Sequence, residues 1–173
     1  TGSTGTGTCV IPPPGVPDIV TVATVCVPEW GAGHCESISV TSVEITGDNC
    51  GAPFAIDGTG TFDFDNSGAD TDGPDHEAVT IAHDMWYCWT APLSGTFMVN
   101  TCEQTSVDTA LAVDEGCEGP TDDSRLLAID DDSCATQTAV TFSATAGQTY
   151  LIRVGTFVNA SGGSGTFTIT PAL

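Results

Sequence analysis

The sequence predicts an all-β protein: an antiparallel β-sandwich or jelly roll with an N-terminal β extension, held together by disulfide bonds. Short runs of alternating apolar and polar residues recur along the chain, with turn residues between them at fairly regular spacing. No segment keeps a 3.6-residue period over several turns, so we expect almost no helix. The cysteines are even in number and form no C-x-x-C pair, which favours disulfides over a zinc ribbon or a thioredoxin motif.

The chain is organised around Asp84-Met85-Trp86-Tyr87-Cys88-Trp89-Thr90-Ala91-Pro92, the most aromatic stretch of an aromatic-poor sequence. Alternation places Met85, Tyr87 and Trp89 on one face of a strand, and Trp86 and Cys88 on the other. Both faces carry large side chains. We therefore predict a central strand covered on both sides, with both tryptophans buried.

Residues 1–47 form the predicted N-terminal extension. Residues 1–8 contain only Thr, Gly and Ser, which is typical either of a flexible leader or of an edge-type strand. Residues 12–14 are three prolines and form an extended spacer. The β-branched run 19–27 and the segment 37–46 are predicted strands.

Residues 48–173 form the predicted sandwich, in which residues 66–84 are a loop rich in Asp, Gly and Asn. Its strands are predicted at 54–56, 61–65, 85–90, 96–102, 108–114, 126–130, 139–144, 149–154 and 165–170. The predicted core comprises Trp86, Leu111, Val113, Phe142, Ile152, Val154, Phe167 and Ile169.

The charge is strongly negative: 23 acidic residues stand against 2 arginines and no lysine, for a net charge of −21. Such a chain repels a phosphate backbone and anionic lipid, so nucleic-acid and membrane-surface partners are excluded. No stretch is apolar enough to span a bilayer. A compact fold with so many carboxylates needs salt, wide spacing or multivalent cations.

Full pairing of the cysteines indicates an oxidising location, so we expect the protein to be extracellular or at a cell surface. The chain begins Thr1-Gly2-Ser3 without a signal-like segment, and we expect a mature chain or a fragment. The cysteines are Cys9, Cys26, Cys35, Cys50, Cys88, Cys102, Cys117 and Cys134. If 108–114 and 126–131 pair as antiparallel neighbours, the residues just outside them meet, which predicts a bridge between Cys102 and Cys134. Three cysteines precede Asp48 and five follow it, so full pairing requires a bridge across that boundary or between chains.

A series of short motifs recurs in order along the chain: Asp48-Asn49-Cys50, Phe62-x-Phe64-Asp65, Asp84-x-Trp86-Tyr87, Asp108-Thr109-x-Leu111, Leu126-Leu127-Ala128-x-Asp130, Tyr150-Leu151-Ile152-Arg153 and Gly165-Thr166-Phe167. Through these motifs, residues from about 48 to 171 resemble secreted bacterial domains of the pre-peptidase C-terminal type. It implies a non-catalytic β-sandwich that accompanies another function. Similar domains often have a cysteine in the loop at 74–84 and another at the position of Leu93. Both are missing here, which leaves the partner of Cys88 open.

Calcium is the cofactor that the composition favours, because it takes hard oxygen ligands from several loops. Pairing of 108–114 with 126–131 would gather carboxylates at one end of the sandwich. The predicted ligands are drawn from Asp84, Asp108, Asp130, Asp131 and Asp132. A second possible metal loop contains Asp70, Asp72 and Asp75, without a glutamate at the EF-hand distance. The alternative is a solvated acidic surface in which aspartates favour turns.

No catalytic constellation stands out, and we expect no enzyme. His76-Glu77 begins like H-E-x-x-H, but Thr80 occupies the second histidine position and His83 has the wrong spacing. Histidines in or beside loops are expected to be solvated. Arg153 lies mid-strand and predicts an ion pair with a nearby carboxylate. Trp30 lies in a loop and is the candidate for an exposed surface contact.

Two functions remain open. The first is a structural protein: a calcium- and disulfide-stabilised subunit that assembles with copies of itself into a filament or surface layer. Its N-terminal segment, about residues 1–27, would pair with a neighbouring subunit. The alternative is a carbohydrate-binding or adhesion module, accessory to a secreted bacterial protein or hydrolase, with polysaccharide as its partner.

Overall fold

The computed structural model describes residues 21–26, 35–40, 47–158 and 160–172, with the backbone alone described for the first two ranges. The chain divides into two compact units, one spanning Pro12–Ile45 and the other including Thr46–Leu173. The predicted boundary between residues 47 and 48 stays a prediction, because the residues just before it lie outside the described ranges. The predicted surface residue Trp30 and the leader at residues 1–8 also lie outside them.

The first unit contains an antiparallel pair of strands, β1 (Thr21–Cys26) and β2 (Cys35–Val40), with Thr21 opposite Val40 and Cys26 opposite Cys35. Two of the predicted N-terminal strands are thus present over their described residues. Within the chain, Thr21–Cys26 pairs with β2, since two runs so close in sequence meet at little cost in loop-closure entropy. The expected pairing of the N-terminal segment, about residues 1–27, with a neighbouring subunit stays a prediction.

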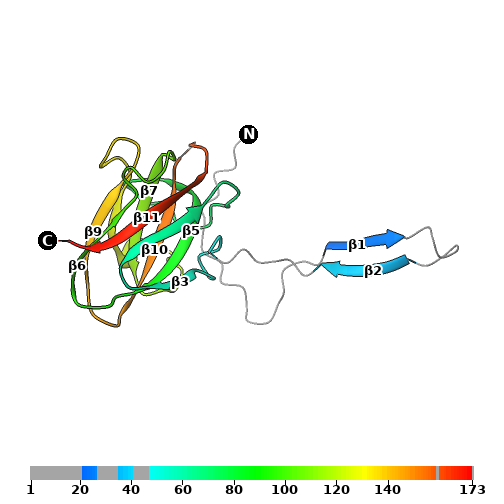
Figure 1. Ribbon diagram of the computed structural model, residues 1–173, viewed down its shortest axis with the longest axis horizontal. Coiled ribbons are helices and arrows are strands. Elements are labelled where there is room, and N and C mark those ends of the chain that lie inside the picture. Colours follow the sequence, from blue (N-terminus) through cyan, green and yellow to red (C-terminus); the bar gives the residue numbers. More distant parts are fainter. Residues whose placement is uncertain (1–20, 27–34, 41–46, 159, 173) are drawn as a thin grey trace. The chain divides into compact units, whose positions relative to one another are not determined.

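The second unit is a sandwich of two sheets (Figure 1). The first sheet has the order β3 (Phe54–Asp57), β5 (Ile81–Thr90), β10 (Thr149–Phe157), β7 (Thr109–Glu115), β8 (Leu126–Asp130). The second sheet has the order β4 (Gly60–Asp65), β11 (Ser164–Pro171), β6 (Gly95–Asn100), β9 (Ala139–Ala144). All neighbours are antiparallel except β3 and β5, which are parallel.

Helix is nearly absent, as predicted: the described residues contain one short 3-10 turn, η2 (Asp123–Arg125). None of them forms a helix that is long and apolar enough to cross a membrane. The all-β sandwich that the alternating pattern predicted is therefore confirmed.

The core lies between the two sheets and is rich in aromatic rings. Met85, Tyr87 and Trp89 of β5 point into it, as alternation along the strand predicted. The ring of Trp89 meets Phe97 of β6 edge-on at 4.9 Å and Phe142 of β9 at 5.8 Å between centroids. The predicted core is confirmed, since each of these residues is at most 5 % exposed: Trp86, Leu111, Val113, Phe142, Ile152, Val154, Phe167 and Ile169.

Trp86 is buried on the opposite, outer face of the first sheet, where it packs with Cys50 and Leu151. A second small cluster on this face contains Val79, Ile81, Ala110 and Ala112. Val79 belongs to the long segment between β4 and β5, which folds back over the sheet. The central strand β5 is therefore covered on both sides, as its two large faces predicted.

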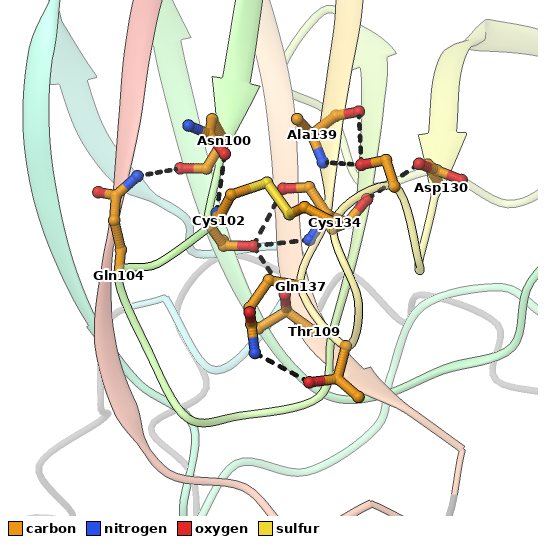
Figure 2. Close-up of a disulfide and its surroundings, with 12 residues drawn as sticks. Asn100, Cys102, Gln104, Thr109, Asp130, Cys134, Gln137 and Ala139 are labelled. Carbon is orange, nitrogen blue, oxygen red and sulfur yellow. Dashed lines mark hydrogen bonds between the residues drawn. A yellow bond between two sulfur atoms is a disulfide. The ribbon is translucent and has the colours of Figure 1, made fainter.

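Two disulfides staple the sandwich. Cys102 is bonded to Cys134, as predicted from the pairing of β7 with β8, in which Leu111 stands opposite Asp130 (Figure 2). Cys88 is bonded to Cys117. Leu151 of β10 lies opposite both Cys88 and Asp114 in the register, which places Cys117 near Cys88.

Cys50 is disulfide-bonded as well. None of the described cysteines is free. This agrees with the predicted full pairing for the five cysteines that follow Asp48.

Candidate functional site

The most elaborate polar group of the sandwich lies on the outer face of the first sheet, and we call it the Arg153 cluster. It comprises Asp72, His76, Asp84, Trp86, Asp114, Asp123 and Arg153. Alternation places Asp84 and Trp86 of β5 on this face, and Arg153 lies beside them because it stands opposite Trp86 in β10. The segment between β4 and β5 supplies Asp72 and His76, and η2 supplies Asp123.

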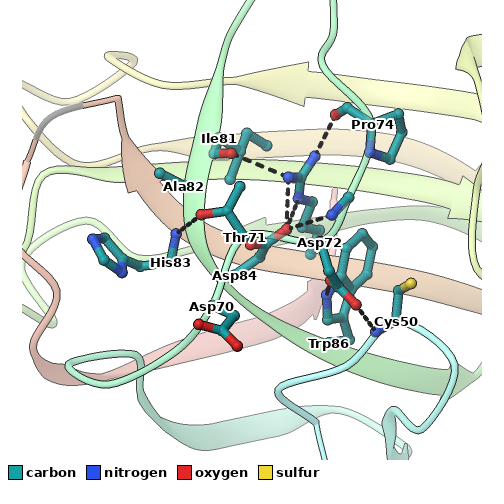
Figure 3. Close-up of polar contacts among 12 residues, drawn as sticks. Cys50, Asp70, Thr71, Asp72, Pro74, Ile81, Ala82, His83, Asp84 and Trp86 are labelled. Atoms are coloured by element: carbon teal, nitrogen blue, oxygen red, sulfur yellow. Dashed lines mark hydrogen bonds and ion pairs between the residues drawn. The ribbon is translucent and has the colours of Figure 1, made fainter. Parts of the chain in front are cut away.

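Arg153 is the centre of this cluster, with a side chain that is 1 % exposed. Its Nε donates to Oδ2 of Asp84 at 2.7 Å, and its Nη2 lies 2.6 Å from the same oxygen. It also donates to the carbonyl oxygens of Pro74, at 2.8 Å, and Ile81, at 3.1 Å (Figure 3). The ion pair predicted for Arg153 is confirmed, and its partner is Asp84.

Asp84 is fully buried and receives a further hydrogen bond from the peptide N–H of Gly73 at 3.2 Å. Burial raises the pKa of its carboxyl, and the neighbouring guanidinium of Arg153 opposes that rise. Gly73 has no room for a side chain, because a Cβ there would collide with the guanidinium of Arg153 and the ring of Trp86. The loop therefore packs directly on the charged pair.

Trp86 joins this loop to the sheet through Asp72. Its Nε1 donates to Oδ1 of Asp72 at 2.8 Å, while the other carboxylate oxygen accepts from the peptide N–H of Cys50 at 2.9 Å (Figure 3). The Arg153 guanidinium lies 5.1 Å from the centroid of the Trp86 ring, within the range of a cation–π contact. Burial raises the pKa of Asp72, and the two hydrogen bonds oppose that rise.

His76 is buried at 6 % exposure, which corrects the expectation of a solvated loop histidine. Its Nδ1 lies 2.6 Å from Oδ1 of Asp123, and its Nε2 lies 3.2 Å from Nη1 of Arg153. Because Nη1 of Arg153 can only donate, Nε2 of His76 accepts a hydrogen bond from it. The other ring nitrogen, Nδ1, is therefore protonated and donates a hydrogen bond to Asp123. Side chains of the fold thus contact both ring nitrogens.

Asp114 of β7 is the unusual member of the cluster. It is 1 % exposed, and neither of its carboxylate oxygens has a hydrogen-bond partner among the described residues. Burial raises its pKa to about 6, although His76, Arg125 and Arg153 nearby favour the charged form. A carboxyl in such surroundings is held there at a cost in stability when it is ionised.

The structure separates the predicted metal ligands. Asp84 belongs to the Arg153 cluster, and the two strands β10 and β7 lie between its strand and β8. Asp108 precedes β7 and Asp130 ends β8, and their antiparallel pairing brings these ends together as expected. One oxygen of Asp108 is buried and has no hydrogen-bond partner among the described residues. Asp130 accepts a hydrogen bond from the Thr138 hydroxyl at 3.3 Å.

The carboxylates of Asp130, Asp131 and Asp132 crowd this end of the sandwich. Partial burial and the charges of Asp132 and Asp130 together raise the pKa of Asp131. Even so, no group of three or more His, Cys, Asp or Glu side chains within the described ranges is arranged to hold a metal ion. Calcium stays a prediction from charge and composition.

In the second possible metal loop, Asp70 and Asp72 form hydrogen bonds with neighbouring parts of the sandwich. Both oxygens of Asp72 accept hydrogen bonds from the protein, as described above. The carbonyl of Asp70 accepts from the peptide N–H of Asp84 at 3.0 Å, and its own N–H donates to Asp48 at 2.9 Å. Asp75 is exposed. These contacts fasten the loop to β5 and to the segment around Asp48.

Sequence reasoning did not find His76, Asp114 or Asp123 as members of one group. They lie on three different elements, and only the sheet order and the folding back of the loop bring them together. The sequence of β7 carried a signal, because Asp114 directly follows the apolar run at residues 110–113 in a strand whose residues are all buried but the last.

No protein-family model matches the chain, and comparisons with curated proteins and with solved structures gave no match. The resemblance to pre-peptidase C-terminal domains therefore stays a prediction from the sequence.

Proposed function

We propose that the chain is a non-catalytic, extracellular structural subunit that assembles with copies of itself into a filament or surface layer. The observation that carries the proposal is the sheet of β1 and β2, in which the described residues form two strands. A two-stranded sheet is marginally stable in water by itself, and among the described residues each of the two strands has one unpaired edge. Pairing with a second copy would stabilise it.

The chemistry of the Arg153 cluster supports a structural role. The polar side chains of this cluster form their hydrogen bonds with other side chains of the sandwich and with backbone groups. An active site would instead aim donors and acceptors at a cleft where a substrate fits. These contacts hold the long segment between β4 and β5 on the sheet, which stiffens the subunit.

An extracellular location fits the two stapling disulfides, Cys88–Cys117 and Cys102–Cys134, because such bonds persist in oxidising compartments. Calcium belongs to the same proposal. A net charge of −21 opposes the packing of subunits, and cations at the acidic end formed by Asp108 and Asp130–Asp132 would reduce that repulsion.

The alternative, a carbohydrate-binding or adhesion module, depends on exposed aromatic platforms. Trp86 and Trp89 are both fully buried and offer no such surface, and the candidate Trp30 lies outside the described residues. A glycan array tests this alternative: specific binding to a polysaccharide by a chain that stays monomeric would favour it over self-assembly.

The leader offers a sharp test of self-assembly, because its removal leaves all the cysteines in place. Sedimentation and electron microscopy would compare the full chain, a chain lacking residues 1–8, and a chain with eight Gly and Ser residues in their place. We expect the full chain alone to polymerise. Equal polymers from all three would show that the leader is a passive linker.

A further inference from the structure

The two sheets of the sandwich end in four edge strands: β3 and β8 in the first sheet, β4 and β9 in the second. Proteins protect such edges with charges, prolines or bulges, because a bare edge pairs with other chains. Acidic residues occur in three of them, as Asp57 in β3, Asp63 and Asp65 in β4, and Asp130 in β8. The fourth, β9, has the sequence Ala-Val-Thr-Phe-Ser-Ala and pairs with β6 without a bulge. It is the unprotected edge of the described sandwich.

The open backbone groups of β9 can be located. The carbonyl of Thr138 accepts from the Thr101 N–H of the neighbouring chain segment at 2.9 Å, so this position faces β6. Backbone groups of successive residues in a strand face opposite neighbours. Ala139 therefore faces outward, and there its N–H donates to Oγ of Ser133 at 2.6 Å. Thr141 and Ser143 face outward as well.

Intramolecular contacts close this edge at both ends and leave its middle free. At one end, the N–H of Ala139 donates to the Ser133 hydroxyl. At the other end, the N–H of Thr145 donates to the Tyr150 hydroxyl at 2.9 Å. The N–H and C=O groups of Thr141 and Ser143 have no partner among the described residues, and both side chains are exposed. A strand of four or five residues laid here would gain up to about four hydrogen bonds.

The leader of the chain has the properties that this short edge requires. In residues 4–8, Thr-Gly-Thr-Gly-Thr, one face of a strand would carry only threonine and the other only glycine. Threonines would lie beside Thr141 and Ser143, where Thr–Thr and Thr–Ser pairs stabilise adjacent strands. Residues 1–17 contain no charge, so they can approach a chain of net charge −21 without repulsion.

We propose that β9 of one copy is the docking site for the leader, residues 1–8, of a second copy, through strand addition at Thr141 and Ser143. The proposal rests on the self-assembly proposed above and names a second contact between copies, besides the pairing of β1–β2 sheets. Because leader and edge are different surfaces, the contact is heterologous and repeats from copy to copy.

Two substitutions in the full chain test the acceptor edge: Thr141→Glu adds a charge there, and Ser143→Pro removes an outward N–H. Neither alters a hydrogen bond within the sandwich. Each should raise the protein concentration needed for assembly about tenfold, the effect of losing one or two ladder bonds. The matched control is Thr61→Glu, an exposed residue of the other edge, β4, which should assemble like the wild type. Thermal melts of the monomers confirm that each variant is folded.

Hydrogen exchange supplies the direct readout, since the amides of Thr141 and Ser143 should exchange quickly in the monomer and slowly in the assembly. Assembly of both β9 variants at the wild-type concentration would overturn the inference while leaving self-assembly intact. Protection of β9 in a chain whose leader has been replaced by Gly and Ser would overturn the leader as its occupant. A wild-type chain that stays monomeric throughout would overturn the proposed function, and the inference with it.

Discussion

Replacing Arg153 with methionine should be among the most damaging single substitutions in the sandwich. It leaves the carboxylate of Asp84 fully buried without its counter-charge. Removing one partner of a buried ion pair costs about 3–5 kcal/mol. The carbonyls of Pro74 and Ile81 also lose their donors, at about 1 kcal/mol each. The sum is comparable to the whole stability of a typical domain.

A double-mutant cycle separates the charge from the loop contacts. Asp84→Asn alone removes the carboxylate to which Arg153 is directly bonded and should also destabilise the fold, while its amide oxygen keeps the bond from Gly73. The double variant removes both charges of this pair. It should therefore be more stable than the sum of the two single losses predicts, by about 2 kcal/mol or more.

The assay is urea unfolding followed by tryptophan fluorescence, since Trp86 lies against the guanidinium. Arg125→Met is the matched control, because it removes the same charge from an arginine paired with Glu118, whose side chain is 87 % exposed. It should cost only about 1 kcal/mol. Equal losses for the two arginine variants, or strict additivity in the cycle, would refute the role given to the buried pair.

Three further outcomes are expected. Burial raises the pKa of Asp114 from 3.8 to about 6, so its contribution to stability is fully present below pH 3.8 and is lost as the pH rises through 6. Asp114→Asn should therefore raise the free energy of unfolding by up to about 3 kcal/mol at pH 7.5 and by little at pH 3.5. An equal gain at both pH values in chemical denaturation would contradict this. Replacing Cys88 and Cys117 with alanine opens a loop of 29 residues and should cost about 3–4 kcal/mol, and an unchanged urea midpoint would count against it. Excess chelator should lower the melting temperature if calcium binds the folded chain, and an unchanged value would argue against a structural ion.

Much of the fold could be predicted from alternation alone. The predicted strands at 126–130 and 139–144 coincide with β8 and β9. The Cys102–Cys134 bridge followed from one correct pairing of neighbouring strands. Local pattern determines where strands begin, because side-chain period is a local property.

Long-range placement is what the sequence could not supply. The partner of Cys88 is Cys117 because Cys88 and Asp114 both lie opposite Leu151, which brings the residues just after Asp114 near Cys88. That register is visible only once β10 is known to lie between β5 and β7. The same sheet order turned Asp84 from a predicted calcium ligand into the partner of Arg153. His76 is buried because its loop folds back over the sheet, and loop composition says nothing about that path.

The central claim, self-assembly through the N-terminal segment, is tested most directly by sedimentation velocity of the full chain over a range of protein concentrations. The runs would be made with calcium, with salt and with chelator, and the products examined by electron microscopy. We predict concentration-dependent polymers without a closed end state, favoured by calcium or salt and abolished when residues 1–8 are removed. A single monomeric species at every concentration and in every buffer would contradict the claim.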